Sequence, residues 1–178
     1  MKEIVTPLIK ASEIEARVSE LAEIIKSDFG SAPITLICIL KGGVIFMVDL
    51  ARKIGLDAQV EFDFMDISSY EDQMESSGII KINKDLENSI KDKNVLLVED
   101  IIDTGRTLSH LINHLSSQKP NILKVCTLLD KPDRRVINDV NVDYVGFKIP
   151  DQFVVGYGLD YAQRYRNLPY IGVLSFEE

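Results

Sequence analysis

Apolar residues near the start of the chain recur at helical spacing. Ile14, Val18 and Leu21 lie three or four residues apart, and this spacing predicts an amphipathic helix with one buried face. Ser12 and Glu15 stand at the start of the pattern with the S-x-x-E spacing of a capping box. We therefore expect the helix to begin at this pair and to end before the glycine that follows the pattern.

The segments that follow alternate between continuous apolar runs and helical spacing. Residues 34–40 form an unbroken apolar run that stops at a Lys-Gly-Gly turn, and helical spacing returns over residues 44–54. Alternating polarity predicts a strand over residues 58–65 and a short return strand over residues 79–82. The polar segment between these two strands is long for a connection, so we expect either a mobile lid or a disordered excursion.

The second half of the chain again alternates between predicted strands and a helix, and the last third has no such alternation. Apolar strands are predicted over residues 95–98 and 122–129, with a helix over residues 108–117 between them. Continuous apolar strands that alternate with helices are typical of an α/β fold, in which a mostly parallel twisted sheet carries helices on both faces. The last third has only short apolar pieces among glycines, prolines and aromatics, and we expect it to form a small cap.

Composition and charge limit the class of partner. The 178 residues include 20 Lys and Arg against 28 Asp and Glu, a net charge of -8, which argues against a nucleic-acid binder because such proteins need a basic surface. The N-terminus has no signal-peptide pattern, and no apolar run approaches the roughly 18 residues of a membrane span. Cys38 and Cys126 lie inside apolar runs, so we expect buried free thiols in a cytoplasmic protein.

Residues 95–107, VLLVEDIIDTGRT, concentrate the side chains that can carry chemistry. The strand brings Glu99 and Asp100 to the carboxyl edge of the sheet, where open α/β folds bind ligands. Residues 103–107 then form a glycine turn that opens a helix, and the N–H groups of such a turn bind phosphate. Adjacent acids before a phosphate cradle suit sugar hydroxyls or a shared magnesium ion. The pattern therefore indicates a phosphorylated sugar as ligand, although it is neither a Walker A loop nor a dinucleotide fingerprint.

The same segment resembles the phosphoribosyl diphosphate signature of the type I phosphoribosyltransferases, and in detail that of the hypoxanthine-guanine phosphoribosyltransferases. Further motifs stand in the order typical of that family: LKGG at 40–43, SSYEDQMESSG at 68–78, DKPDRR at 130–135, IPDQFVVGYGLDY at 149–161 and YRNLPYIGVL at 165–174. The resemblance implies one phosphoribosyltransferase domain over residues 1–178. Its base-binding hood would come mainly from about residues 145–178 and from the N-terminal segment.

The resemblance also implies an activity. The enzyme would serve purine salvage by transferring the 5-phosphoribosyl group of phosphoribosyl diphosphate to hypoxanthine, guanine or both, giving IMP or GMP and pyrophosphate. It would require Mg²⁺, bind a 6-oxopurine, and form a homodimer or homotetramer with no nucleic-acid or membrane partner.

Site residues follow from the matched motifs. Asp103 would be the catalytic general acid/base beside the purine N7. The 5-phosphoribosyl group and its phosphate would be bound by Glu99, Asp100, Asp103, Thr104, Gly105, Arg106 and Thr107. Pyrophosphate would be bound by Lys41, Gly42 and Arg166, with a strained or cis Lys41–Gly42 peptide. The purine would contact Lys131, Phe153, Val154 and Asp160. Ser69 and Tyr70 would belong to a mobile loop that closes over the site. Magnesium would be held by Glu99, Asp100 and Asp160.

Two alternatives to this activity stay open at this point. The first is an RNA-binding regulator on the same fold, which the net charge of -8 argues against. The second is a phosphoribosyltransferase for another base: adenine and pyrimidines fit poorly with a Lys131 donor, because a donor favours 6-oxopurines. Xanthine stays open, because Gln152 stands where many members of the family have lysine.

Two adjacent cations, Arg134 and Arg135, follow the DKP segment. Asp130 and Asp133 are close to them in sequence, so we expect local ion pairs rather than a basic patch.

Overall fold

The computed structural model describes residues 2–55, 59–69, 80–137 and 140–177. Its elements, in chain order, are β1 (Lys2–Ile9), α1 (Ala11–Phe29), β2 (Ile34–Leu40), α2 (Val44–Ile54), β3 (Val60–Ser69), β4 (Ile80–Lys84), β5 (Asn94–Ile102), α3 (Arg106–Ser117), β6 (Ile122–Asp130), the 3-10 turn η1 (Pro132–Arg134), β7 (Tyr144–Lys148), β8 (Val154–Val155) and β9 (Ile171–Glu177).

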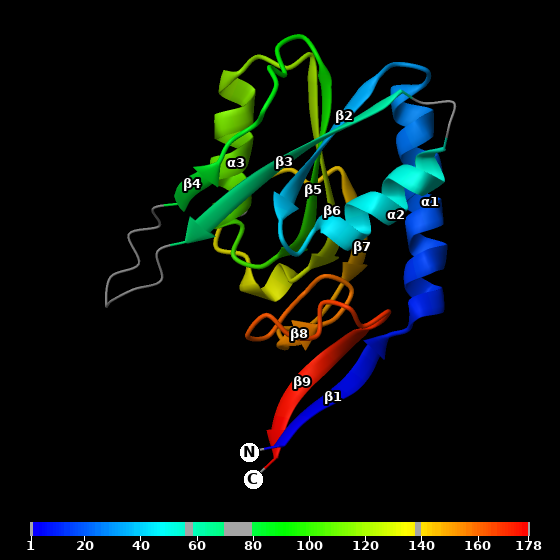
Figure 1. The fold of residues 1–178 in the computed structure, drawn as a ribbon, viewed down its shortest axis with the longest axis vertical. Helices are drawn as coiled ribbons and strands as arrows, with labels where there is room; N and C mark the ends of the chain where they lie inside the picture. The colour runs from blue at the N-terminus through cyan, green and yellow to red at the C-terminus, as the bar shows by residue number, and fades with distance from the viewer. Residues whose placement is uncertain (1, 56–58, 70–79, 138–139, 178) are drawn as a thin grey trace.

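The main sheet has six strands in the order β4-β3-β2-β5-β6-β7. All neighbours pair in parallel except β3 and β4, which are antiparallel. Leu36 and Cys38 of β2 pack in a core with α1 and α2, whereas Ile37 and Ile39 pack in a second core with α3. Figure 1 shows these helices on opposite faces of the sheet. The predicted mostly parallel α/β fold with helices on both faces is therefore confirmed.

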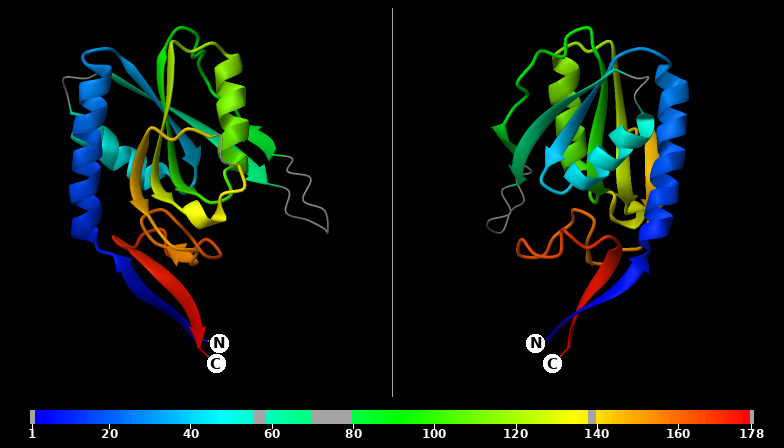
Figure 2. Two further views of the ribbon diagram at one scale, coloured as in Figure 1. Left: turned by 180° about the vertical axis from the view of Figure 1, so that it is seen from behind. Right: turned by 45° about the vertical axis from the view of Figure 1, so that its right-hand side comes forward.

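A second, three-stranded sheet lies beyond the carboxyl ends of the parallel strands, in the order β1-β9-β8. Its main pair, β1 and β9, joins residues near the two ends of the chain, from Lys2 with Glu177 to Ile9 with Ile171. Figure 2 shows this ribbon extending away from the main sheet, with both termini at its far end. We call this sheet and residues 149–170 the hood. Because β7 completes the main sheet, this hood starts after β7. The predicted base-binding role of about residues 145–178 stays a prediction.

Two predicted element boundaries need correction. The cap of α1 is not the pair Ser12 and Glu15: the helix begins at Ala11, and the Lys10 backbone N–H donates to the Glu13 carboxylate at 2.9 Å. The N-cap is Lys10, so the S-x-x-E spacing of Ser12 and Glu15 lies two residues too late. The strand predicted over residues 58–65 is longer, because pairing with β4 extends β3 to Ser69.

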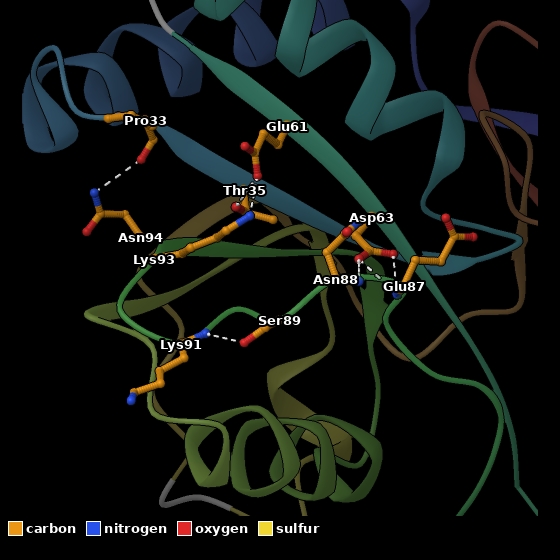
Figure 3. Close-up of polar contacts among 10 residues, drawn as sticks. All are labelled: Pro33, Thr35, Glu61, Asp63, Glu87, Asn88, Ser89, Lys91, Lys93 and Asn94. Atoms are coloured by element: carbon orange, nitrogen blue, oxygen red, sulfur yellow. Dashed lines mark hydrogen bonds and ion pairs between the residues drawn. The ribbon is translucent and has the colours of Figure 1, made fainter.

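The charged connector between β4 and β5 is fastened at the edge of the sheet opposite the hood. Buried Asp63 of β3 accepts the backbone N–H groups of Glu87 and Asn88 at 3.1 and 3.2 Å (Figure 3). Beside it, Lys93 donates to Glu61 at 2.6 Å. A buried carboxylate needs such donors, so this acid has a structural role away from the strand ends that carry the site.

Two further expectations concern cysteines and membranes. Cys38 and Cys126 are buried and free, as predicted. Among the helices of the described residues, none is both long and apolar enough to cross a membrane.

Candidate active site

The predicted site residues gather where β5 and β6 end, facing the hood. A cavity of about 230 Å³ opens at this edge, and most of its lining follows the end of β5. It is lined by Ile39, Ile67, Glu99, Asp100, Ile101, Ile102, Asp103, Thr104, Gly105, Thr107 and Leu108. All the residues predicted to bind the phosphoribosyl group except Arg106 therefore line one cavity.

Glu99 and Asp100 occupy the carboxyl-terminal part of β5, which continues to Ile102. Burial, followed by the charge of Asp100, raises the pKa of Glu99 well above its usual range. Burial also raises the pKa of Asp100 to about 6, against an opposing contribution from the charge of Arg166. The charged forms of two adjacent desolvated acids lack stabilising partners. A bound cation, or a hydrogen bond from a sugar hydroxyl, would stabilise them.

The turn after β2 packs tightly against Asp100 and the hood. A β-carbon on Gly42 would overlap Oδ2 of Asp100, so a side chain at this position would displace the carboxylate. Gly158 of the hood lies against the Gly42 carbonyl, which a β-carbon on Gly158 would overlap. The cis peptide of this turn is Leu40–Lys41, one bond before the predicted Lys41–Gly42. Lys41 itself is exposed.

Gly158→Ala is expected to lower the free energy of unfolding by about 2–4 kcal/mol, from steric overlap together with backbone strain. The residue has φ +104° and no room for a β-carbon beside the Gly42 carbonyl. Gly30→Ala is the matched control, because Gly30 has φ +60° but open space around its β-carbon position. Urea unfolding of both variants measures the difference. Equal losses would contradict a tight Gly42–Gly158 contact.

Asp160 and Arg166 form an ion pair within the hood. Oδ1 of Asp160 lies 2.8 Å from Nη2 of Arg166, and Oδ2 accepts the Gln163 backbone N–H at 2.8 Å. Nη1 of Arg166 donates to the Gly158 carbonyl at 2.7 Å. The predicted pyrophosphate-binding arginine is thus held next to the Gly42–Gly158 contact, and its charge reaches Asp100.

Residues 103–107 form a loop that opens α3, as predicted, with Gly105 as the N-cap residue. The Thr104 carbonyl accepts the backbone N–H groups of Val136 and Ile137 at 3.0 and 3.1 Å, which supports the loop from behind. The Thr104 hydroxyl accepts the Arg106 N–H at 3.4 Å. The first N–H groups of a helix have no partner within it, so this loop presents donors suited to a phosphate.

Lys131 follows β6 and lies next to the loop after β5 that carries Asp103. Lys131 is buried, and its backbone N–H donates to the Ile102 carbonyl at 3.0 Å, which ties the end of β6 to the end of β5. Its Nζ lies 3.6 Å from Asp151 Oδ1. Asp103 accepts a hydrogen bond of 2.9 Å from Arg134. The structure therefore brings the predicted base-binding lysine and the predicted acid/base residue into one charged group.

The hood contributes Phe153 and Val154, which differ in exposure. Val154 is buried in β8, while Phe153 is 54% exposed and contacts Tyr161 edge-on with ring centroids 5.8 Å apart. An exposed ring beside the site is available for stacking, as the prediction requires. Tyr161 in turn contacts Phe176 of β9 at 5.5 Å.

The donor set fits a magnesium ion that arrives with a phosphorylated substrate. Mg²⁺ commonly uses one or two protein carboxylates together with water and substrate phosphates, and Glu99 and Asp100 are a desolvated pair of that kind. Within the described ranges, no three His, Cys, Asp or Glu side chains form a ready-made metal cluster. The assignment of magnesium to Glu99, Asp100 and Asp160 stays a prediction.

Two predicted residues cannot be placed fully. Tyr70 lies outside the described residues, and Ser69 is described only as the last residue of β3. Their role in loop closure stays a prediction.

Several contacts of the site were not foreseen from the sequence. Arg135 pairs with Asp130 at 2.9 Å, as expected, but Arg134 pairs with Asp103 and Asp151 instead of Asp133. The only sequence signal was the DKPDRR motif itself, which does not show which arginine turns toward the cavity.

A long-range contact also holds the Asp160–Arg166 turn. Glu3 of β1 accepts hydrogen bonds from Arg164 and from the hydroxyl of Tyr165. Ala162, Gln163 and Tyr165 have positive φ, a conformation that few side chains adopt without support. Pairing of β1 with β9 brings Glu3 to this strained turn.

Known proteins are similar to this chain in both sequence and fold. A family model described as phosphoribosyl transferase domain matches residues 8–162. A hypoxanthine phosphoribosyltransferase of Buchnera aphidicola is 48% identical over 180 residues, which cover 100% of each protein.

Solved structures give the same result. A hypoxanthine-guanine phosphoribosyltransferase of Bacillus anthracis matches with a TM-score of 0.90 and 44% identity, over 98% of this chain and 100% of that chain. A hypoxanthine phosphoribosyltransferase of Trypanosoma cruzi, solved in complex with the product IMP, matches with a TM-score of 0.87 and 38% identity, over 95% and 93%. These matches confirm the type I phosphoribosyltransferase fold. On the agreement of family model, full-length relatives and structures, the chain belongs to the phosphoribosyltransferase family and, within it, to the hypoxanthine-guanine phosphoribosyltransferases.

Proposed function

We propose that this protein is a purine salvage enzyme, which transfers the 5-phosphoribosyl group of phosphoribosyl diphosphate to hypoxanthine, guanine or both. The products are IMP or GMP and pyrophosphate. One observation carries the proposal: the phosphate loop at 103–107, the buried acids of β5 and the Lys131–Asp103 group line one edge of the sheet beneath the hood. The relatives described above, each named for hypoxanthine, support it, and they lend no support to an RNA-binding regulator or to another base.

Substrate binding divides among the elements of the site. The loop of residues 103–107 receives the 5′-phosphate through backbone N–H groups and the positive end of α3. Lys41 and Arg166 supply positive charge to the diphosphate, and Gly42 allows close approach of the backbone. Glu99 and Asp100 accept the ribose hydroxyls. A bound magnesium ion, held by these acids and Asp160, would supply positive charge against the leaving pyrophosphate.

The remaining residues handle the purine. Asp103 takes or gives the proton at N7, so that the base can attack the ribosyl carbon as the bond to pyrophosphate breaks. The Lys131 ammonium donates to O6, Phe153 stacks on the ring, and the backbone near Val154 and Asp160 contacts the remaining edge. Holding the two reactants at the correct distance and orientation supplies much of the rate acceleration for a transfer of this kind.

A steady-state assay of nucleotide formation tests the proposal directly. The purified chain is supplied with magnesium, phosphoribosyl diphosphate and, in separate reactions, hypoxanthine, guanine, xanthine or adenine. We expect turnover with one or both of hypoxanthine and guanine, and at least tenfold lower kcat/KM with adenine, because a buried ammonium opposes an amino group. Turnover with adenine alone, or with none of the four bases, would overturn it.

Lys131→Ala is expected to raise KM for hypoxanthine by about 10–100-fold, because a charge-assisted hydrogen bond of roughly 1.5–3 kcal/mol is lost. KM for phosphoribosyl diphosphate should change by less than about threefold, since Lys131 is assigned to the base and not to that substrate. Lys148→Ala, at an exposed lysine that ends β7, is the matched control. Equal rises in both KM values would contradict the assignment of Lys131 to the base.

We extend the proposal to assembly and location. The enzyme forms a homodimer or homotetramer, which light scattering on the purified chain tests: a single monomeric mass would contradict it. The two buried free thiols favour a reducing compartment, and we assign the enzyme to the cytoplasm.

A further inference from the structure

One guanidinium connects two loops near the proposed base-binding residues. Nε of Arg134, at the end of η1, donates to Oδ1 of Asp103 at 2.9 Å. Nη1 of the same side chain donates to Oδ2 of Asp151 at 3.5 Å. The other oxygen of Asp151 lies 3.6 Å from Nζ of Lys131. Arg134 therefore links the loop after β5 to the loop before β8, and Asp151 is shared by two cations.

The ion pairs of this network are too exposed to contribute much to the stability of the fold. The side chains of Arg134, Asp103 and Asp151 are 48%, 41% and 49% exposed. Ion pairs at this exposure stabilise a protein by at most about 1 kcal/mol each. The neighbouring Arg135 differs, since its pair with Asp130 has both side chains nearly buried, at 12% and 10% exposure. The two adjacent arginines therefore have different roles, and only the buried one is structural.

The contacts also leave the reactive atoms accessible. Among the described residues, the hydrogen bond of Asp103 to Arg134 uses Oδ1, so Oδ2 remains for the purine proton. Oδ1 of Asp151 faces the Lys131 ammonium, which has three N–H donors. One carboxylate oxygen cannot accept all three, so Lys131 keeps a donor for the base. A planar guanidinium holds its partners in fixed directions, whereas an unpaired carboxylate rotates freely.

We propose that Arg134 is a positioning residue, which orients the Asp103 carboxylate directly and the Lys131 ammonium through Asp151. This inference rests on the proposed function, because it takes Asp103 as the acid/base group and Lys131 as the donor to the base. In this role Arg134 acts through its contacts with Asp103 and Asp151, and it need not contact a substrate. A proton transfer needs an acid/base group within about 2.6–3.2 Å of its target, so loss of orientation lowers turnover without removing any reacting atom.

The test compares Arg134→Gln and Arg134→Lys with Arg52→Gln. Arg52 of α2 is the matched control: it is 76% exposed and lies 3.8 Å from Asp49. We expect Arg134→Gln to lower kcat about tenfold and to raise KM for hypoxanthine severalfold, with KM for phosphoribosyl diphosphate within about twofold of the parent. Arg134→Lys should recover part of kcat, because an ammonium can still pair with Asp103. Arg52→Gln should match the parent.

A double-mutant cycle separates positioning from a merely structural effect. If Arg134 acts on kcat through Asp103, then Arg134→Gln added to Asp103→Asn should lower kcat no further. A lower melting temperature with equal rises in both KM values would show a structural role and overturn the inference. Parent-like kinetics of Arg134→Gln in an active enzyme would overturn it while leaving the proposed function intact. An inactive parent enzyme would instead overturn the proposed function.

Discussion

Asp103→Asn is expected to lower kcat by about 10²–10⁴-fold, the usual contribution of a general acid/base group. Asparagine has nearly the same shape and can still accept a hydrogen bond from Arg134, so the local packing should persist. What it cannot do is take up the N7 proton. Steady-state kinetics with hypoxanthine give kcat, and calorimetry gives the dissociation constant of phosphoribosyl diphosphate, which we expect to change by less than about threefold, because the lost group acts in the transition state.

Asp133→Asn is the matched control for this experiment. Asp133 is an exposed aspartate in η1, within the turn that also carries Arg134. Its variant should keep the parent kcat. Near-normal turnover of Asp103→Asn would remove Asp103 from the acid/base role, whereas a matching loss of phosphoribosyl diphosphate affinity would point to a binding role instead.

Removal of magnesium by excess chelator is expected to lower the rate by about 10³-fold or more. A divalent cation commonly contributes several kcal/mol of charge stabilisation, and each 1.36 kcal/mol is roughly tenfold in rate. The requirement for magnesium should be strong in this site. Glu99 and Asp100 are desolvated acids with raised pKa values, and the proposed substrate that binds next to them is highly anionic. Initial rates in chelator, and after magnesium is restored in excess, measure the effect.

The control for chelation is the folded state. Circular dichroism and the melting temperature of the substrate-free chain should not change with chelator, since the described residues contain no ready-made metal cluster on which folding could depend. A full rate in chelator would contradict the magnesium roles of Glu99, Asp100 and Asp160. An irreversible loss on adding magnesium back would show damage to the protein rather than a reversible requirement.

The parts of the site that the sequence predicts well are contiguous. Residues 99–107 belong to one strand end, one turn and one helix start, so local geometry alone brings Glu99, Asp103 and Gly105 to the same cavity. The matched motifs likewise predicted the family, which the comparisons confirm. The individual roles of these residues stay predictions until the variants are measured.

Other parts depend on segments that are remote in sequence. Gly42 and Gly158 meet only because the hood folds back over the turn after β2. Glu3 reaches the Asp160–Arg166 turn only through the pairing of β1 with β9. The choice of Arg134 rather than Arg135 as partner of Asp103 depends on which way η1 turns. No pattern of spacing encodes such contacts, because they arise from the packing of separate elements.

By itself, the sequence determined the α/β class, the phosphate loop and the family, because apolar periodicity and contiguous motifs act over a few residues. The tertiary structure alone decided that β7 belongs to the main sheet, that β1 pairs with β9, and that Arg134 bridges Asp103 and Asp151. The physical reason is that strand order and side-chain partners are set by the burial of whole elements against one another. That burial brings together residues that no local pattern connects.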